Sequence, residues 1–398
     1  MRLIFLVIIS ATLTTQCSVN PSNQELTKYS AKKIGELPAK CINEKNPGVA
    51  GAFSGIINDK LIIAGGANFM DKKPWEGGTK TYHDKIYAFE LKNDSLKTID
   101  LTVTLPEPLA YGASISMKEG ILCIGGNGPV ECSSKVYLIK WDEAANDIII
   151  NYFPELPAPL SFSTAVMIDE VVYVTGGSSS PGGVETQNYF FMLDLSKRNT
   201  PEFEWEKLPP YPGISRILSV SVAQSNETRK CIYLFSGRNI SNTDKPVVLN
   251  DGLIYDPVSK KWDTIPMPYS LNFPVMAGSA FPSGKNNIVF IGGVADTIFL
   301  KELHLKIDIA DAIQRENELK SDSLKVELNR FYNEHQGFSS KILIYNTRSN
   351  TISTAGNFNT FCPVTTSAIP YMDGAIVASG EIKPGIRTPD IFIIKQYN

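Results

Sequence analysis

A carboxylate and a guanidinium stand six positions apart in a short turn near the C-terminus. Glu381 directly follows an apolar run, Pro384 and Gly385 favour a tight turn, and Arg387 comes after that turn. The chain is therefore predicted to return to its starting point, with both side chains at one site. A carboxylate can take up and release a proton, and a guanidinium can hold an anion by paired hydrogen bonds. The two residues form either an acid–base site or a structural ion pair, and their spacing leaves both open.

Four further polar residues are candidate substrate-binding residues because they lie next to apolar, strand-like runs. Asn68, Asn127 and Arg238 follow runs that end in glycine, and Arg216 precedes another such run. For the two arginines the alternative is an ordinary charge on the surface. The three histidines are scattered along the chain, so we expect no metal site built on imidazoles and no organic cofactor.

An apolar run that ends in a small residue and a glycine occurs six times. The final glycines of these runs are Gly66, Gly126, Gly177, Gly237, Gly293 and Gly380. The intervals between them are 60, 51, 60, 56 and 87 residues. A strand-like run with tyrosine or phenylalanine follows in each unit. Four short strands repeated every 50 to 60 residues or so predict an all-β fold, a six-bladed β-propeller of the Kelch type.

The sixth repeat is incomplete at the C-terminus. It has strands predicted at about 364–371, 374–380 and 390–396, after which the chain ends. Residues 31–38 have the pattern of a fourth strand with no first three before it. We therefore expect this N-terminal strand to complete the last blade and close the ring, which removes two free sheet edges. Residues 17–398 are then one propeller domain.

The longest interval contains an insertion, predicted at residues 301–336. This segment is rich in charged residues, and its apolar residues recur at helical spacing, for example Leu324, Leu328 and Phe331. One or two short amphipathic helices are expected between the fifth and sixth blades, lying over one mouth of the ring. They form either a lid over a binding site or a solvated decoration or dimer contact.

The first residues have the pattern of an export signal. Arg2 is followed by seven apolar residues and then by small and polar ones, so residues 1–16 are predicted to be a cleaved signal peptide. Leu13, four residues before Cys17, resembles a bacterial lipobox, whereas Gln16 fits that motif poorly. Lipid attachment at Cys17 and ordinary cleavage nearby remain equal alternatives. The protein is expected in the periplasm or cell envelope, without a membrane span because no later apolar run is long enough.

Composition excludes several classes of protein. The 398 residues carry 38 basic and 41 acidic side chains, a net charge of −3, so no basic surface for nucleic acid is expected. Hydrophobic residues make up 43% and charged residues 20%, which is typical of a globular fold. Length alone favours two or three domains, whereas the repeat favours one ring. The six cysteines contain no CxxC pair and are expected to be buried and unpaired, with a Cys123–Cys132 bridge left open.

Several segments of the chain resemble a known family. They include Gly-Gly-Ala-Asn-Phe at 65–69, Tyr-His-Asp-Lys-Ile-Tyr at 82–87 and, most specifically, Gly-Glu-Ile-Lys-Pro-Gly-Ile-Arg-Thr at 380–388. These segments are similar to the cyclically permuted branch of the N-acetylneuraminate mutarotases, also called epimerases, which are six-bladed Kelch proteins. The resemblance covers essentially the whole mature chain.

The resemblance implies an isomerase that interconverts the α- and β-anomers of N-acetylneuraminate, a sialic acid, by acid–base opening and closing of the sugar ring. It implies that Glu381 and Arg387 are the catalytic pair and that Arg216 and Arg238 add to a clamp on the carboxylate of the sugar. No cofactor is implied, and the oligomeric state is left open. Two alternatives remain: a non-catalytic Kelch propeller that binds glycan or protein at the cell envelope, and a mutarotase for another sugar.

Overall fold

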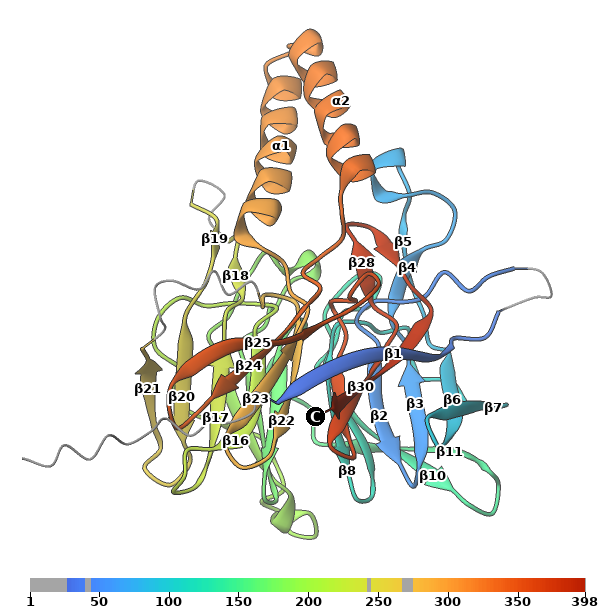
Figure 1. Ribbon diagram of the computed structural model, residues 1–398, viewed down its shortest axis with the longest axis vertical. Helices are drawn as coiled ribbons and strands as arrows, with labels where there is room; N and C mark the ends of the chain where they lie inside the picture. The colour runs from blue at the N-terminus through green and yellow to red at the C-terminus, as the bar shows by residue number, and fades with distance from the viewer. Residues whose placement is uncertain (1–26, 40–43, 242–244, 267–274, 398) are drawn as a thin grey trace, which may run out of the picture.

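The computed structural model describes residues 27–39, 44–241, 245–266 and 275–397. Within them, six four-stranded antiparallel sheets follow one another along the chain as the blades of a propeller (Figure 1). The predicted all-β, six-bladed fold is therefore confirmed. The predicted signal peptide and Cys17 lie outside the described residues.

Each of blades 1 to 5 is built from four strands of one repeat, and the strands neighbour one another in the sheet in the order in which they occur along the chain. Blade 1 consists of β2 (Phe53–Ile57), β3 (Lys60–Ala64), β6 (Ile86–Lys92) and β7 (Ser95–Ile99). Blade 2 consists of β8 (Ala113–Met117), β9 (Gly120–Ile124), β10 (Val136–Asp142) and β11 (Asp147–Phe153). Blade 3 consists of β12 (Thr164–Ile168), β13 (Val171–Thr175), β14 (Phe190–Asp194) and β15 (Glu206–Lys207). Blade 4 consists of β16 (Val220–Ser225), β17 (Lys230–Phe235), β20 (Gly252–Asp256) and β21 (Lys261–Ile265). Blade 5 consists of β22 (Ser279–Ser283), β23 (Asn287–Ile291), β24 (Lys341–Asn346) and β25 (Thr351–Asn357).

Short elements decorate the connections between these strands. Small hairpins extend the loops that leave the second strands of blades 1, 4 and 6. They are β4 (Ala67–Phe69) with β5 (Lys80–Tyr82), β18 (Arg238–Asn239) with β19 (Val247–Val248), and β28 (Glu381–Lys383) with β29 (Ile386–Arg387). Three single-turn 3₁₀ helices also occur: η1 (Pro74–Glu76), η2 (Pro181–Gly183) and η3 (Leu195–Lys197).

The N-terminal strand completes the last blade. Blade 6 consists of β26 (Ala368–Tyr371), β27 (Gly374–Ala378), β30 (Asp390–Tyr397) and, from the other end of the chain, β1 (Lys28–Glu36). β1 pairs antiparallel with β30 along its length, from Lys28 opposite Tyr397 to Glu36 opposite Asp390. The expected closure of the ring is thus confirmed. Tyr29 of β1 is 1% exposed, its ring lies edge-on to Phe281 of blade 5, and its hydroxyl is 2.6 Å from Oγ of Ser283.

Because Tyr29 anchors the closing strand across two blades, Tyr29→Ala is expected to lower the free energy of unfolding by about 3–5 kcal/mol. Urea unfolding followed by circular dichroism measures this loss. Lys32→Ala is the matched control, since Lys32 is exposed on the same strand. A Tyr29→Ala midpoint equal to that of the control would show that the strand is not held by this side chain.

A hydrophobic cluster fills the space between each pair of neighbouring blades, including blades 6 and 1. Around the axis, just before each innermost strand, one residue has a left-handed backbone, with φ between 51° and 68°. The N–H of each donates to the carbonyl of its counterpart in the preceding blade, at 2.6 to 3.2 Å. We call these six residues the collar: Gly51, Tyr111, Phe162, Leu218, Ala277 and Thr365. The closed ring of hydrogen bonds fixes the width of the axial opening.

The charged insertion forms two helices, α1 (Asp296–Gln314) and α2 (Glu318–Glu334). They stand as a hairpin that projects from one end of the propeller (Figure 1). The hairpin connects β23 to β24 inside blade 5, which corrects its expected place between blades 5 and 6. Helix α1 also begins five residues before the predicted start. The glycine interval spans the whole of blade 5 after β23, so it could not decide on which side of β24 the insertion falls.

Two further expectations concern cysteines and the membrane. Cys123, Cys132, Cys231 and Cys362 are buried free thiols, so the Cys123–Cys132 bridge is not formed. Across the described part of the chain, no helix has the length and apolar character required to cross a membrane.

Candidate active site

A cavity of about 370 Å³ opens at the end of the axis that carries the helical hairpin. Its floor is the collar, and its sides come from the loop hairpins of blades 1, 4 and 6 and from the base of α1 and α2. Six charged residues line it: Lys80, Arg238, Glu302, Lys306, Glu381 and Arg387. The sequence-predicted residues Glu381, Arg387 and Arg238 are therefore brought to one cavity.

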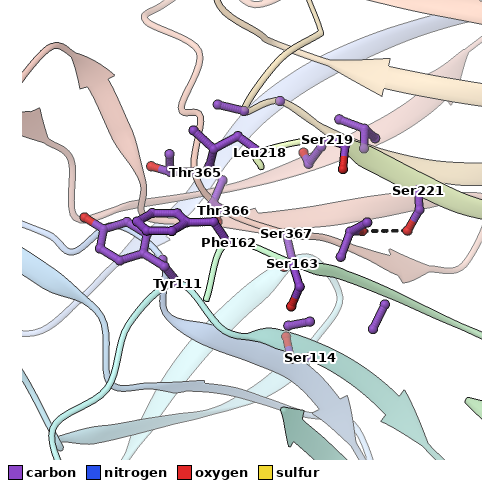
Figure 2. Close-up of a pocket in the computed structure, with 18 of the residues that line it drawn as sticks. Tyr111, Ser114, Phe162, Ser163, Leu218, Ser219, Ser221, Thr365, Thr366 and Ser367 are labelled. Carbon is purple, nitrogen blue, oxygen red and sulfur yellow. Dashed lines mark hydrogen bonds between the residues drawn. The ribbon is translucent and has the colours of Figure 1, made fainter. Parts of the chain in front are cut away.

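A second cavity of about 190 Å³ lies on the axis below the collar. Figure 2 shows hydroxyl groups around it, among them those of Ser114, Ser163, Ser219 and Ser221. Its described lining contains no carboxylate, amine or guanidinium. Five collar residues border both cavities, so the collar separates a shaft of neutral hydroxyls from the charged cavity above. Of these two cavities, the upper one therefore carries the carboxylates and cationic side chains.

The backbone before Glu381 fixes where this carboxylate begins. Ser379 has φ of 57° and Gly380 has φ of 119°. A Cβ at Gly380 would lie 2.8 Å from the carbonyl oxygen of Val364, so a larger residue does not fit there. Glu381 and Val364 then exchange two backbone hydrogen bonds of 2.8 and 2.9 Å. Glu381 is thereby held at the rim of the axis, next to the collar.

The hairpin of β28 and β29 places Arg387 directly across from Glu381. Oε1 of Glu381 accepts a 2.6 Å hydrogen bond from the N–H of Gly385 and lies 3.6 Å from Nη1 of Arg387. At this distance the carboxylate and the guanidinium form an ion pair but no hydrogen bond. The guanidinium rests on the ring of Phe69, with Cζ 4.8 Å from the ring centre. The tight turn thus holds the carboxylate and the cation side by side without saturating either.

Arg387 is a buried cation with unused donors. Its side chain is 4% exposed, and among the described residues Nε and Nη1 have no hydrogen-bond partner. Burial alone lowers the pKa of Arg387, but the charge of Glu381 and the hydroxyl of Tyr111 outweigh burial and raise the pKa above its usual value. The guanidinium stays charged and has donors for an anionic ligand.

Arg238 supplies a second guanidinium, on a half-buried side chain. It lies on β18, and its Cζ is 4.3 Å from the centre of the Phe299 ring, at the base of α1. Burial lowers the pKa of Arg238 to about 10, while the charges of Glu302 and Glu381 act against that fall. Its Nε is buried without a hydrogen-bond partner in the described structure. A cation of this kind favours an anion in the cavity.

Arg216 is not brought to the cavity. Its side chain is 1% exposed, and it makes two hydrogen bonds to Asp251, of 2.6 and 2.9 Å. It also donates to the carbonyl oxygens of Ile214 and Ser236. The expected role of Arg216 in a carboxylate clamp does not fit this geometry, because Asp251 already neutralises the guanidinium and ties two loops of blade 4 together.

Asn68 and Asn127 also lie outside the lining of the cavity. Asn68 is 3% exposed, donates to the carbonyl of Gly48 and meets Nε2 of His83 at 2.8 Å. Asn127 is 1% exposed and donates to the hydroxyl of Tyr82 at 2.6 Å. Both amides are used to hold the loops that follow β3 and β9, so their expected contact with substrate is not supported by their positions.

The structure adds cavity residues that sequence reasoning missed. The helical hairpin contributes Phe299, Glu302, Leu303 and Lys306 from α1 and Tyr332 from α2. The four α1 residues are spaced as one face of a helix, and this signal was available in the sequence. Only Phe299 precedes the insertion predicted at residues 301–336, and the spacing alone does not show which face of the helix meets the ring. The collar aromatics Tyr111 and Phe162, stacked at 4.7 Å, gave no comparable signal.

The comparisons with known proteins agree with this architecture. The N-acetylneuraminate epimerase of Salmonella paratyphi B is 28% identical over 243 residues, which are 60% of this chain and 57% of that protein. That of Vibrio cholerae serotype O1 is 37% identical over 123 residues, or 30% of this chain and 32% of that protein. The matches to these curated relatives therefore span at most little more than half of their length.

A solved structure described as "Structure of YjhT" superposes with a TM-score of 0.57 at 14% identity, covering 92% of this chain and 99% of that one. This likeness concerns the fold alone. The family model for N-acetylneuraminate epimerase matches residues 8–149 and 153–397. Since that match extends over most of the sequence, the chain belongs to the N-acetylneuraminate epimerase family.

Proposed function

We propose that this protein is a mutarotase that interconverts the α- and β-anomers of N-acetylneuraminate. The observation that carries the proposal is the pairing of Glu381 with Arg387 in a cavity that also holds the half-buried guanidinium of Arg238. Family membership points to the same sugar. A carboxylate beside two unsaturated guanidinium groups suits acid–base chemistry on a substrate that is itself a carboxylic acid.

The proposed reaction opens and recloses the sugar ring at C2. Glu381 takes the proton from the anomeric hydroxyl, the bond between C2 and the ring oxygen breaks, and the protonated Glu381 gives its proton to that oxygen. The resulting open-chain keto acid turns about its C2–C3 bond. Closure reverses the steps on the other face of the carbonyl and regenerates the carboxylate. One acid–base residue is therefore sufficient, and general acid–base help is typically worth about 10²- to 10⁴-fold.

Arg387 and Arg238 are proposed to bind the C1 carboxylate, next to the reacting carbon. Both have buried donors without a partner in the described residues. The cavity wall has four cationic side chains against two carboxylates, which attracts an acidic sugar. Its volume of about 370 Å³ lies within the range of small-molecule sites.

The test is to add the protein to freshly released α-N-acetylneuraminate and follow both anomers by NMR. Equilibration faster than in buffer, at a rate proportional to protein concentration, is the expected result. If the rate equals that of buffer while ligand-observed NMR detects binding, the protein is a sialic acid-binding propeller. Acceleration with a different acidic or N-acetylated sugar only would assign another substrate.

Export of the protein belongs to the same proposal. The apolar run after Arg2 and the position of Cys17 support a signal peptide that ends near residue 16. Mass spectrometry of the N-terminal peptide from the envelope fraction distinguishes a lipid-modified Cys17 from an unmodified start nearby. An N-terminal peptide that still begins with Met1 would refute the signal peptide.

A further inference from the structure

The base of the helical hairpin forms a polar wall of the cavity. On α1, Phe299, Glu302, Leu303 and Lys306 recur at intervals of three and four residues, so one face of the helix lines the cavity. The remainder of the hairpin projects away from the ring (Figure 1). Its contribution to the site therefore comes from the first three turns of α1 and from Tyr332 on α2.

Glu302 is the fixed acceptor on this wall. Its Oε1 receives a 2.9 Å hydrogen bond from the hydroxyl of Tyr332 and a 2.6 Å hydrogen bond from Nζ of Lys306. Burial and the neighbouring charge of Glu302 raise the pKa of Tyr332, so its hydroxyl keeps its proton and remains a donor. Both of these bonds end on Oε1. A carboxylate has two acceptor oxygens. Among the described residues no side chain donates a hydrogen bond to Oε2, and the Glu302 side chain is 18% exposed, so this oxygen can accept from a ligand.

Tyr332, which holds Glu302 through its hydroxyl, also packs against the segment that supports the turn carrying Glu381. The ring of Tyr332 stacks on Trp75 of η1 at 4.2 Å and 14°. Trp75 and Pro74 in turn pack against Gly385, where a Cβ would lie 3.0 Å from Trp75 and 2.5 Å from Pro74. Gly385 is the residue whose N–H holds Oε1 of Glu381. Glu302 and Glu381 are thus positioned by one continuous packed unit from three separate segments.

This arrangement assigns the two carboxylates to different parts of one ligand. The reacting carbon has to lie at Glu381, so Glu302, on another wall of the same cavity, meets a more distant part of the sugar. A carboxylate accepts hydrogen bonds and therefore selects donors. In N-acetylneuraminate the densest group of donors away from C2 is the side chain at C6, which carries three adjacent hydroxyls.

We infer that Glu302 is a specificity residue that accepts hydrogen bonds from the hydroxyls of the three-carbon side chain of the sugar. This inference rests on the proposed function. Tyr332 and Lys306 are positioning residues that hold the carboxylate in one orientation.

The experiment compares two substrates. One is N-acetylneuraminate, and the other is its seven-carbon analogue, prepared by periodate cleavage and borohydride reduction of the side chain of a 2-glycoside, in which C2 is protected, followed by hydrolysis of the glycoside. Glu302→Gln keeps the shape of the residue and an acceptor for Tyr332. It is expected to lower kcat/KM for the full sugar by about 10- to 100-fold through KM, because hydrogen bonds to a charged group are lost. Activity on the shortened analogue is expected to change by less than about twofold.

Glu318→Gln is the control, an exposed position at the far end of the same hairpin, and is expected to match the wild type on both sugars. Equal loss on both sugars in Glu302→Gln would overturn the inference, since a structural or electrostatic role would not distinguish the side chain. No loss on either sugar would also overturn it.

Failure of the proposed function gives a different result. If the wild type does not accelerate mutarotation, ligand-observed NMR binding of the same two sugars replaces the rates. Preference for the full sugar that disappears in Glu302→Gln then supports the specificity role without catalysis. Equal binding of both sugars by the wild type overturns it.

Discussion

Glu381→Gln is expected to lower kcat for N-acetylneuraminate mutarotation by about 10²- to 10⁴-fold. Glutamine keeps an oxygen that accepts the hydrogen bond from Gly385, which is 2.6 Å long in the native turn, so the hairpin is retained. It cannot take up the proton of the anomeric hydroxyl. The loss therefore falls on the chemical step and leaves KM nearly unchanged.

Exchange NMR at saturating sugar measures kcat, and circular dichroism with thermal unfolding verifies the fold. The same Glu318→Gln variant is the matched control, because it makes an identical chemical change at an exposed helix position. A Glu381→Gln enzyme with kcat within about twofold of the wild type would remove Glu381 from its proposed role. Catalysis would then have to come from another group in the cavity.

Arg238→Met is expected to lower kcat/KM by about 10²- to 10³-fold, mainly through KM, without loss of stability. The native guanidinium lies over the ring of Phe299, its Nε is buried, and it has no carboxylate as a hydrogen-bond partner in the described structure. Removing one side of a buried charge pair with the substrate costs several kcal/mol of binding, of order 2–5. In the free protein the same change removes a half-buried cation that has no hydrogen-bonded carboxylate partner in the described structure, and methionine fills a similar volume. The free energy of unfolding is therefore expected to stay equal or rise by about 1–2 kcal/mol.

Arg216→Met makes the same chemical change but is expected to lower the stability of the protein and to leave catalysis unchanged. It breaks two hydrogen bonds to Asp251 and two to backbone carbonyls. Asp251 is 43% exposed and regains water, so the expected loss is about 2–4 kcal/mol, below that of a fully buried pair. Its kcat/KM is expected to remain near the wild-type value at temperatures where the protein is folded.

Urea unfolding and steady-state rates on the two arginine variants separate a binding role from a structural one. If Arg238→Met unfolds as readily as Arg216→Met and keeps its KM, Arg238 is a structural residue. If Arg216→Met loses binding while retaining stability, the assignment of the two residues is reversed.

The architecture follows from patterns that are local in the sequence. Six glycine-ended runs gave the number of blades, because each run is one strand followed by a turn with left-handed residues such as Gly380. The missing fourth strand of the last repeat and the solitary strand near residue 30 predicted closure, since an open blade would leave two unpaired edges. The pairing of β1 with β30 confirms this reasoning. The predicted position of the helical insertion, between blades 5 and 6, was wrong. The interval between two glycines shows that extra residues are present, but it does not show which strand follows them.

The turn from Glu381 to Arg387 was also within reach of the sequence. Its geometry depends on Pro384, Gly385 and two paired strand residues, all within seven positions. Short-range turn chemistry decides such a structure almost independently of the rest of the chain.

The sequence by itself therefore determined the number of blades, the closure of the ring and the juxtaposition of Glu381 with Arg387. Only the tertiary structure decided which arginine faces the cavity. Arg216 meets Asp251, 35 residues further along the chain, whereas Arg238 meets Phe299 and no carboxylate within hydrogen-bonding distance among the described residues. It also decided that Glu302, Tyr332 and Trp75 support the turn from Glu381 to Arg387. These contacts join segments that are distant in sequence, and their partners are chosen by the packing of the closed ring, which no local pattern encodes.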